Sequence, residues 1–193
     1  MAIVNAAFYF LSVIYLPFIA AGSPNTKIYL QVLYIVIAII FSYLFVILKR
    51  LLEKIRIDNV SANIHLIIIS YLASATLEQL MYASYSGSSF SSHPELGLVL
   101  LGYTIIKIIL GIILIKFASK LNKQKNKPDF LESYPGWIKI SGALYIIAGI
   151  TGGGGLIFSV IASLLLAISM QSLFLKAAKD TEKSSTEAEN VPT

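Results

Sequence analysis

Two charged side chains lie well away from the ends of long apolar stretches of this sequence, and they are the residues best suited to chemistry. Lys107 lies in the run Tyr-Thr-Ile-Ile-Lys-Ile-Ile at 103–109, and Glu78 lies in the preceding apolar stretch. A lysine at the centre of a membrane span costs about 2.5–3.5 kcal/mol on insertion scales, so such residues usually face a bundle interior and pair. If consecutive stretches run antiparallel, a lysine stem can cover the difference in depth between the two residues. We therefore expect Glu78 and Lys107 to form an ion pair.

Helical spacing places further polar side chains beside this pair. Residues four apart share a helix face, and two such series contain the ionisable groups: Ser70, Ser74, Glu78 and Tyr82, and Tyr103, Lys107 and Gly111. The predicted intramembrane polar site consists of Glu78, Lys107, Ser74, Gln79, Tyr82 and Thr104. It would suit an ion, a proton or a small solute. The alternatives are a structural ion pair that fixes helix register, or a lysine that snorkels outward from a shallower position.

Residue types that would support catalysis or a resident metal are scarce. The chain has no cysteine and only two histidines. His65 lies near the start of the apolar stretch 62–83, and His93 lies in the gap that follows the end of that stretch. A haem held by two histidines is therefore not expected. Glu78 is the single carboxylate within the apolar stretches, whereas metal-dependent lipid chemistry needs clustered acidic ligands. We expect no catalytic residues, no metal site and no cofactor, so the protein is predicted not to be an enzyme.

Six apolar stretches must position these residues. The chain is 56% hydrophobic and 13% charged, with a mean hydropathy of +0.78, whereas soluble domains carry about 25% charged residues. A membrane-spanning helix needs about 20 mostly apolar residues. The stretches cover residues 3–21, 28–48, 62–83, 96–118, 138–153 and 155–175. The predicted fold class is an all-α, polytopic integral membrane helix bundle with about six transmembrane helices.

The Lys and Arg residues fall almost entirely in every second gap between these stretches. Basic residues follow the second, fourth and sixth stretches, whereas the opposite gaps contain only Lys27. Short loops rich in Lys and Arg stay in the cytoplasm, so both termini are predicted to be cytoplasmic in a multi-pass plasma-membrane protein. The net charge of +5 then reflects contact with lipid headgroups of the bilayer, and no nucleic-acid partner is expected.

The polar gaps between the apolar stretches also divide the chain into four predicted regions. Residues 1–119 form a predicted four-span membrane region, 120–137 a cytoplasmic polar loop, 138–176 a transmembrane hairpin, and 177–193 a disordered cytoplasmic tail. Glycines at 152–155 are interpreted as the hairpin turn, with a re-entrant segment as the alternative. Gly142, Gly149, Ser159 and Ser163 are small residues at spacings that let helices approach closely. Residues 49–58 form either an interfacial helix or a continuation of the second span.

Two functions fit this organisation. The first is a small-solute or ion transporter, or the membrane-embedded solute-binding subunit of one. In span number and length the chain resembles the substrate-binding subunit of energy-coupling-factor vitamin transporters, although Ala2 and Ala6, which have the Ala-x-x-x-Ala spacing, lie at the extreme terminus. The second is a non-enzymatic accessory or structural subunit of a larger membrane complex. The expected partners are the bilayer and other membrane proteins or a second copy of the chain.

Overall fold

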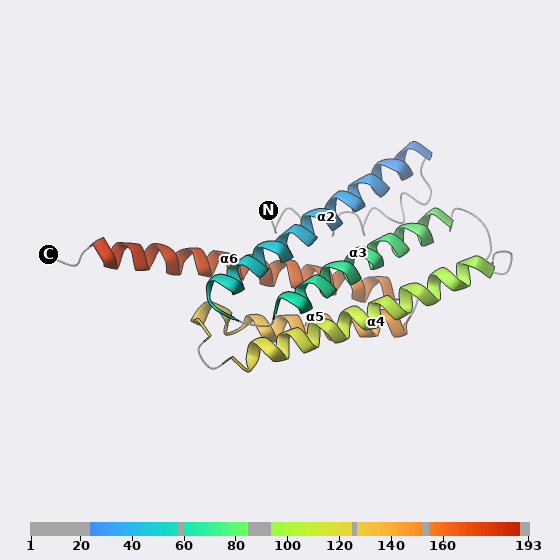
Figure 1. The fold of residues 1–193 in the computed structure, drawn as a ribbon. Helices are drawn as coiled ribbons and strands as arrows, with labels where there is room; N and C mark the ends of the chain where they lie inside the picture. Colours follow the sequence, from blue (N-terminus) through green and yellow to red (C-terminus); the bar gives the residue numbers. More distant parts are fainter. Residues whose placement is uncertain (1–23, 58–59, 85–93, 125–126, 152–154, 190–193) are drawn as a thin grey trace.

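The computed structural model describes residues 24–57, 60–84, 94–124, 127–151 and 155–189. Nearly all of them are helical, and no strand occurs among them. The helices are α2 (Pro24–Lys54), α3 (Ser61–Ser84), α4 (Pro94–Asn122), η2 (Asp129–Leu131), α5 (Tyr134–Ile150) and α6 (Leu156–Glu189). Figure 1 shows α2 to α6 as an antiparallel bundle in which neighbouring helices alternate in direction. The predicted stretch at 3–21 lies outside the described residues.

Three of these helices are long and apolar enough to cross a membrane. The segments are Ile35–Lys54 in α2, Gly97–Asn122 in α4 and Ile157–Thr181 in α6. Large hydrophobic side chains on α2, α3 and α4 face outward from the bundle, for example Ile39, Ile69 and Leu98. An outer surface of this kind suits contact with lipid rather than water. These findings support the membrane class of the predicted fold.

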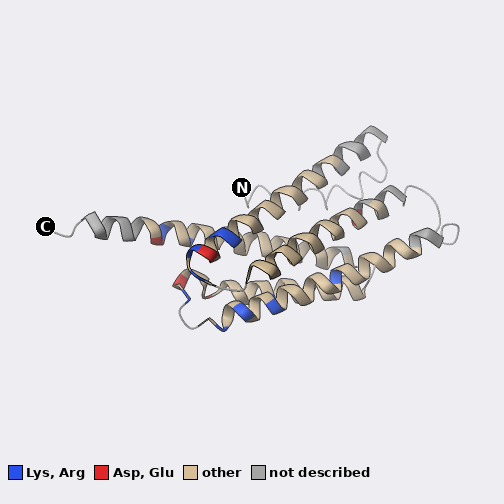
Figure 2. Cartoon of the chain, in the orientation of Figure 1, with Lys and Arg blue, Asp and Glu red and all other residues tan. Residues whose placement is uncertain are grey.

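Most of the charged residues gather at one end of the bundle. Figure 2 shows Lys and Arg near the end of α2, near the end of α4 and on the part of α6 beside them. The corresponding residues include Lys49, Arg50, Lys120 and Lys176. Because α2, α4 and α6 run in the same direction, their basic ends come together. The fold therefore brings to one end the basic residues that the sequence distributes over alternate gaps.

The structure decides between the two interpretations of residues 49–58. α2 continues to Lys54 and then closes with Arg56 at a φ of 57°. The Ile57 N–H donates to the Leu52 carbonyl at 3.0 Å and the Arg56 N–H donates to the Glu53 carbonyl at 3.0 Å, which is the Schellman pattern of a helix end. Residues 49–54 therefore continue the second apolar helix, and no separate interfacial helix forms there.

Two predictions about the polar segments are corrected. The loop predicted at 120–137 is partly structured, since α5 begins at Tyr134 and both Phe130 and Leu131 are buried. Its apolar side chains cover the end of the bundle. The tail predicted to be disordered from 177 is helical as far as Glu189, and Figure 1 shows α6 projecting beyond the other helices. Its alanine, lysine and glutamate residues favour helix even without apolar contacts. Residues 190–193 lie outside the described part.

Glycines bring α4 and α5 into backbone contact. A Cβ built on Gly142 would stand 2.8 Å from the Gly111 carbonyl oxygen, and one on Gly111 would overlap the Gly142 carbonyl oxygen. A Cβ on Gly149 would stand 2.9 Å from the Thr104 carbonyl oxygen. Such distances leave no room for a side chain, so the predicted role of Gly142 and Gly149 in close helix packing is confirmed. The glycine turn itself, at 152–154, lies outside the described residues.

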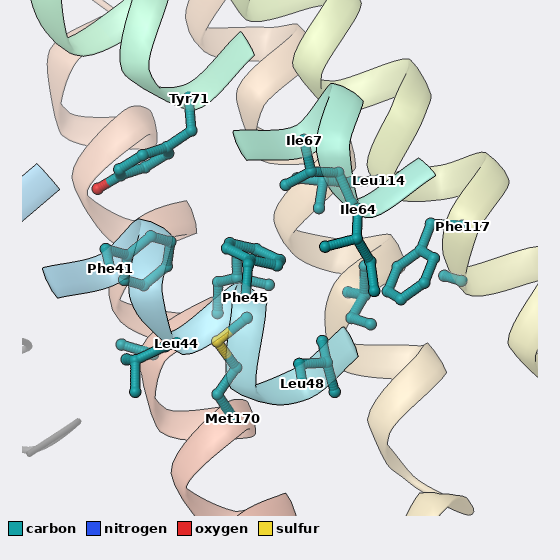
Figure 3. Close-up of a cluster of buried hydrophobic side chains, with 14 of the residues drawn as sticks. Phe41, Leu44, Phe45, Leu48, Ile64, Ile67, Tyr71, Leu114, Phe117 and Met170 are labelled. Atoms are coloured by element: carbon teal, nitrogen blue, oxygen red, sulfur yellow. The ribbon is translucent and has the colours of Figure 1, made fainter. Parts of the chain in front are cut away.

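An apolar core fills the bundle towards its basic end. Figure 3 shows Phe41, Phe45, Ile64, Phe117 and neighbouring side chains packed between α2, α3, α4 and α6. Phe41 and Phe45 contact edge to face, with ring centroids 5.5 Å apart, which is a favoured aromatic geometry. Phe45 and Leu48 are fully buried. This core fixes how the four helices sit together and so positions the polar residues farther along them.

Candidate functional site

Glu78 and Lys107 form the ion pair that their helical register predicts. The Lys107 Nζ lies 2.7 Å from the Glu78 Oε1. Glu78 is 3% exposed and Lys107 is 2% exposed, so water screens neither charge. α3 supplies the carboxylate and α4 supplies the ammonium. The predicted contact between the two residues is confirmed.

Ser159 on α6 joins the pair, although the sequence did not indicate it. The Lys107 Nζ donates to the Ser159 Oγ at 2.5 Å, and the Ser159 Oγ donates to the Glu78 Oε1 at 3.4 Å. Ser159 is therefore both acceptor and donor within the pair. The sequence had marked Ser159 and Ser163 only as small residues for helix packing. Their polarity among mostly apolar neighbours is the available signal in the sequence, and it does not say which helix they face.

Two tyrosines enclose the ammonium on its remaining sides. The Lys107 Nζ lies 5.1 Å from the ring centroid of Tyr103 and 5.1 Å from that of Tyr145. Both distances are within the range in which an aromatic face attracts a cation. Tyr103 stands one helical turn before Lys107 on α4, and Tyr145 comes from α5. The ammonium thus contacts side chains of its own helix and of three others.

A short chain of hydrogen bonds fixes the Tyr145 ring. The Tyr145 hydroxyl lies 2.6 Å from the Ser163 Oγ, and the Ser163 Oγ donates to the Ser159 carbonyl at 2.9 Å. Because Ser163 has a single hydroxyl proton, Tyr145 is the donor in the first bond. The chain ties α5 to α6 at the level of the ion pair, so the ring position depends on both helices.

The other predicted site residues divide into three groups. Ser74 is buried one turn before Glu78, and its Oγ has no hydrogen-bond partner among the described residues. Thr104 is partly buried on α4, where its carbonyl oxygen approaches Gly149 of α5. Gln79 and Tyr82 lie on α3, but their side chains are outside the described part of the structure. The structure therefore places Ser74 one helical turn from Glu78 and adds Ser159, Tyr103 and Tyr145 to the surroundings of Lys107.

The electrostatics of the site follow from burial and charge balance. The positive Lys107 and negative Glu78 give the pair no net charge, and a buried pair tolerates its loss of hydration only when its geometry and hydrogen bonds are good. Here one hydroxyl and two ring faces supplement the carboxylate. Among the described residues, no cluster of three His, Cys, Asp or Glu side chains could hold a metal ion. The arrangement suits recognition of a positive charge or a proton.

A separate surface groove lies along α6. Its volume is about 300 Å³. The lining residues occupy one face of the basic end of the helix: Ile168, Gln171, Ser172, Leu175, Lys176 and Lys179. The described lining residues all lie beyond Ser163 along α6. The polar site is enclosed by side chains in this conformation.

Comparison with known proteins gives no further guide to the role of this site. No protein family model, curated protein or solved structure matches the chain.

Proposed function

We propose that this chain is a multi-pass membrane protein that transports a small solute or ion, or binds it as the membrane subunit of a transporter. The observation that carries the proposal is the enclosed Glu78–Lys107 pair with the Ser159 hydroxyl between its members. Ionisable groups inside membrane helices are expensive, and they commonly mark substrate or ion pathways. Because the side chains around the pair come from four helices, a movement of these helices relative to one another would change the contacts of the pair.

The proposal includes six membrane spans with both termini in the cytoplasm of a plasma-membrane protein. Its support is the apolar length of α2, α4 and α6 and the gathering of basic residues at one end of the bundle. α3 and α5 run between these helices in the opposite direction, so they would complete the crossings, with the stretch at 3–21 as the first. The basic end would face the cytoplasm, in keeping with the positive-inside rule.

A non-enzymatic accessory subunit of a larger membrane complex is the second candidate. The observation that favours it is that the Lys107 ammonium already has a carboxylate, a hydroxyl and two aromatic rings around it. A pair satisfied in this way is also able to fix the register of α3, α4 and α6 without binding anything. In that case the functional surface would be an outer face of the bundle, covered by a partner protein or a second copy.

Purification from the native membrane separates the two candidates. The tagged protein would be extracted in mild detergent, and everything retained would be identified by mass spectrometry. A retained small solute, moved by proteoliposomes of the single chain, supports the transporter. Stoichiometric protein partners without solute movement by the chain or its complex support the accessory role.

Site variants then test whether the ion pair takes part. Glu78→Gln and Lys107→Met are each expected to abolish movement or binding of the retained solute while the protein remains in the membrane. Glu53→Gln and Lys116→Met are matched controls, because both side chains are exposed. Full activity of both site variants would rule out a functional role for the pair.

A further inference from the structure

We infer that the groups around the Lys107 ammonium form a binding site for primary ammonium cations, and that a small protonated amine exchanges with Lys107 at Glu78. This inference rests on the proposed function, because it names the class of solute. In the structure the site is occupied by the protein's own side chain. Lys107 is in this sense a tethered ligand, whose ammonium stands where the amine would bind.

The surroundings of the ammonium carry the inference. α3 provides a carboxylate from Glu78, α6 a hydroxyl from Ser159, α5 a ring face from Tyr145 and α4 a ring face from Tyr103. An ion pair alone would need only the carboxylate. A carboxylate, a hydroxyl acceptor and two aromatic faces together satisfy both the charge and the N–H donors of an ammonium group. Three of the four groups come from helices other than that of Lys107.

Ser74 supplies a second, independent observation. Its hydroxyl is buried one turn before Glu78, on the same side of α3, and it lacks a hydrogen-bond partner among the described residues. Buried hydroxyls are usually bonded, and a serine within a helix commonly bonds to the carbonyl four residues earlier. This hydroxyl, one helical turn from the residue that supplies the carboxylate, is available to accept an N–H of the bound amine.

Charge balance decides what must leave when an amine enters. A buried carboxylate balances one positive charge, so a second ammonium beside Glu78 would leave an unpaired charge in the bundle. In the exchange, R–NH₃⁺ takes the place of Lys107 at the carboxylate, and the Lys107 Nζ gives up one proton to solvent and becomes a neutral amine. Lysine is suited to this step because its ammonium deprotonates when its charge is no longer balanced.

The groups that face Lys107 allow this step. Glu78 on α3 is its only charged neighbour among the described residues that contact it, and Tyr103, Tyr145 and Ser159 from α4, α5 and α6 are neutral. When an amine neutralises Glu78, no other negative charge in this set holds the proton on Lys107. Amine binding and proton release are therefore coupled.

Proton release from the full-length protein in detergent tests the inference. Methylammonium chloride would be added to weakly buffered protein at matched pH, with binding followed by calorimetry and protons by an indicator dye. Tetramethylammonium and potassium chloride are the controls for charge without N–H donors. We expect release of about one proton for each methylammonium bound, because the site keeps no net charge, and none with the controls. Absence of methylammonium binding, or equal release with potassium, would overturn the inference.

Variants assign the release to Lys107. Lys107→Arg keeps a positive charge but cannot deprotonate, so proton release should fall to the level of the controls. Glu78→Gln should weaken methylammonium binding by at least about tenfold, because the charged acceptor is lost. Lys116→Arg on the exposed side of α4 should behave as wild type. If either site variant is not monodisperse, methylammonium binding and proton release by the wild type still test the inference.

The measurements distinguish failure of the amine inference from failure of the proposed transport function. If the protein binds no methylammonium but moves another retained solute, the amine inference fails and transport stands. If no solute is bound or moved and only protein partners are retained, both fail. Binding with proton release in the wild type supports both.

Discussion

The two buried regions of this bundle are built from opposite kinds of residue. Towards the basic end, Phe41, Phe45 and Leu48 of α2 pack against apolar side chains from three other helices (Figure 3). Farther along the helices, Glu78 and Lys107 meet at 2.7 Å with hardly any exposure. Both regions exclude solvent, yet only the first consists of residues that close packing alone would favour.

This difference separates the apolar residues that hold the helices together from the polar residues that the helices position. Apolar side chains gain dispersion contacts with every neighbour and need no particular partner. A buried ion pair gains little net stability over an apolar pair of similar volume, but it strongly penalises the loss of one member. We therefore expect the apolar core to maintain the fold and the polar site to be retained for its chemistry.

Breaking the ion pair should give the largest loss of stability. Lys107→Met leaves the Glu78 carboxylate buried without its counter-charge, and we expect a decrease of about 3–5 kcal/mol in the free energy of unfolding. The double variant Glu78→Leu/Lys107→Met should recover most of this loss, because no charge then remains. Unfolding in detergent micelles, followed by circular dichroism, measures both. A double variant no more stable than Lys107→Met would show that the pair itself stabilises the fold.

Truncation in the apolar core should weaken the fold and leave the polar site intact. Leu48 is fully buried near the end of α2, and Leu48→Ala should lower the free energy of unfolding by about 2–4 kcal/mol. Solute binding by the folded fraction should equal that of wild type. A loss of binding at a temperature where the variant is fully folded would mean that the two regions are not separable.

A methyl group at the α4–α5 contact should affect both regions. Gly142→Ala places a Cβ against the Gly111 carbonyl, and we expect a loss of about 1–3 kcal/mol as the helices separate. Because α4 carries Lys107 and α5 carries Tyr145, binding at the polar site should also weaken. Gly136→Ala is the control, since a Cβ there meets nothing within 4 Å. Equal stability of the two variants would contradict the close contact.

Removing the bridging hydroxyl should have the smallest effect on stability and a clear effect on binding. Ser159→Ala deletes one acceptor of the Lys107 ammonium, for an expected loss of about 1–2 kcal/mol. Ser169→Ala is the control on the same helix, because it removes a buried hydroxyl that donates to the Leu166 carbonyl. If Ser159→Ala binds solute as well as Ser169→Ala does, Ser159 is not part of the site.

The ion pair could be predicted from sequence because each member is conspicuous. Charged residues are rare in apolar helices, and α3 and α4 are consecutive, so antiparallel packing with helical register restricts the partner of Lys107 to Glu78. Ser159 and Tyr145 could not be found in this way. They come from helices far along the chain, and serine or tyrosine on an apolar helix is common enough to carry no partner information.

The corrected segments show where composition misleads. The loop at 120–137 is polar on average, but Phe130, Leu131 and Tyr134 are buried against the bundle. The average composition of the segment does not reveal that these three side chains are buried. The residues after 177 have few apolar side chains, a composition that predicts disorder, although α6 continues to Glu189. Helix propensity and continuity with a preceding helix decide that segment, while hydropathy does not report either.

Native mass spectrometry of wild type and of the double variant Glu78→Leu/Lys107→Met, both purified from the same membranes, shows whether the polar site binds a solute. We expect that the wild type carries a bound solute and that the double variant, which recovers most of the wild-type stability, has lost it. A double variant that retains the same solute, or a wild type that carries none while its protein partners remain bound, would contradict the claim that the polar site serves recognition.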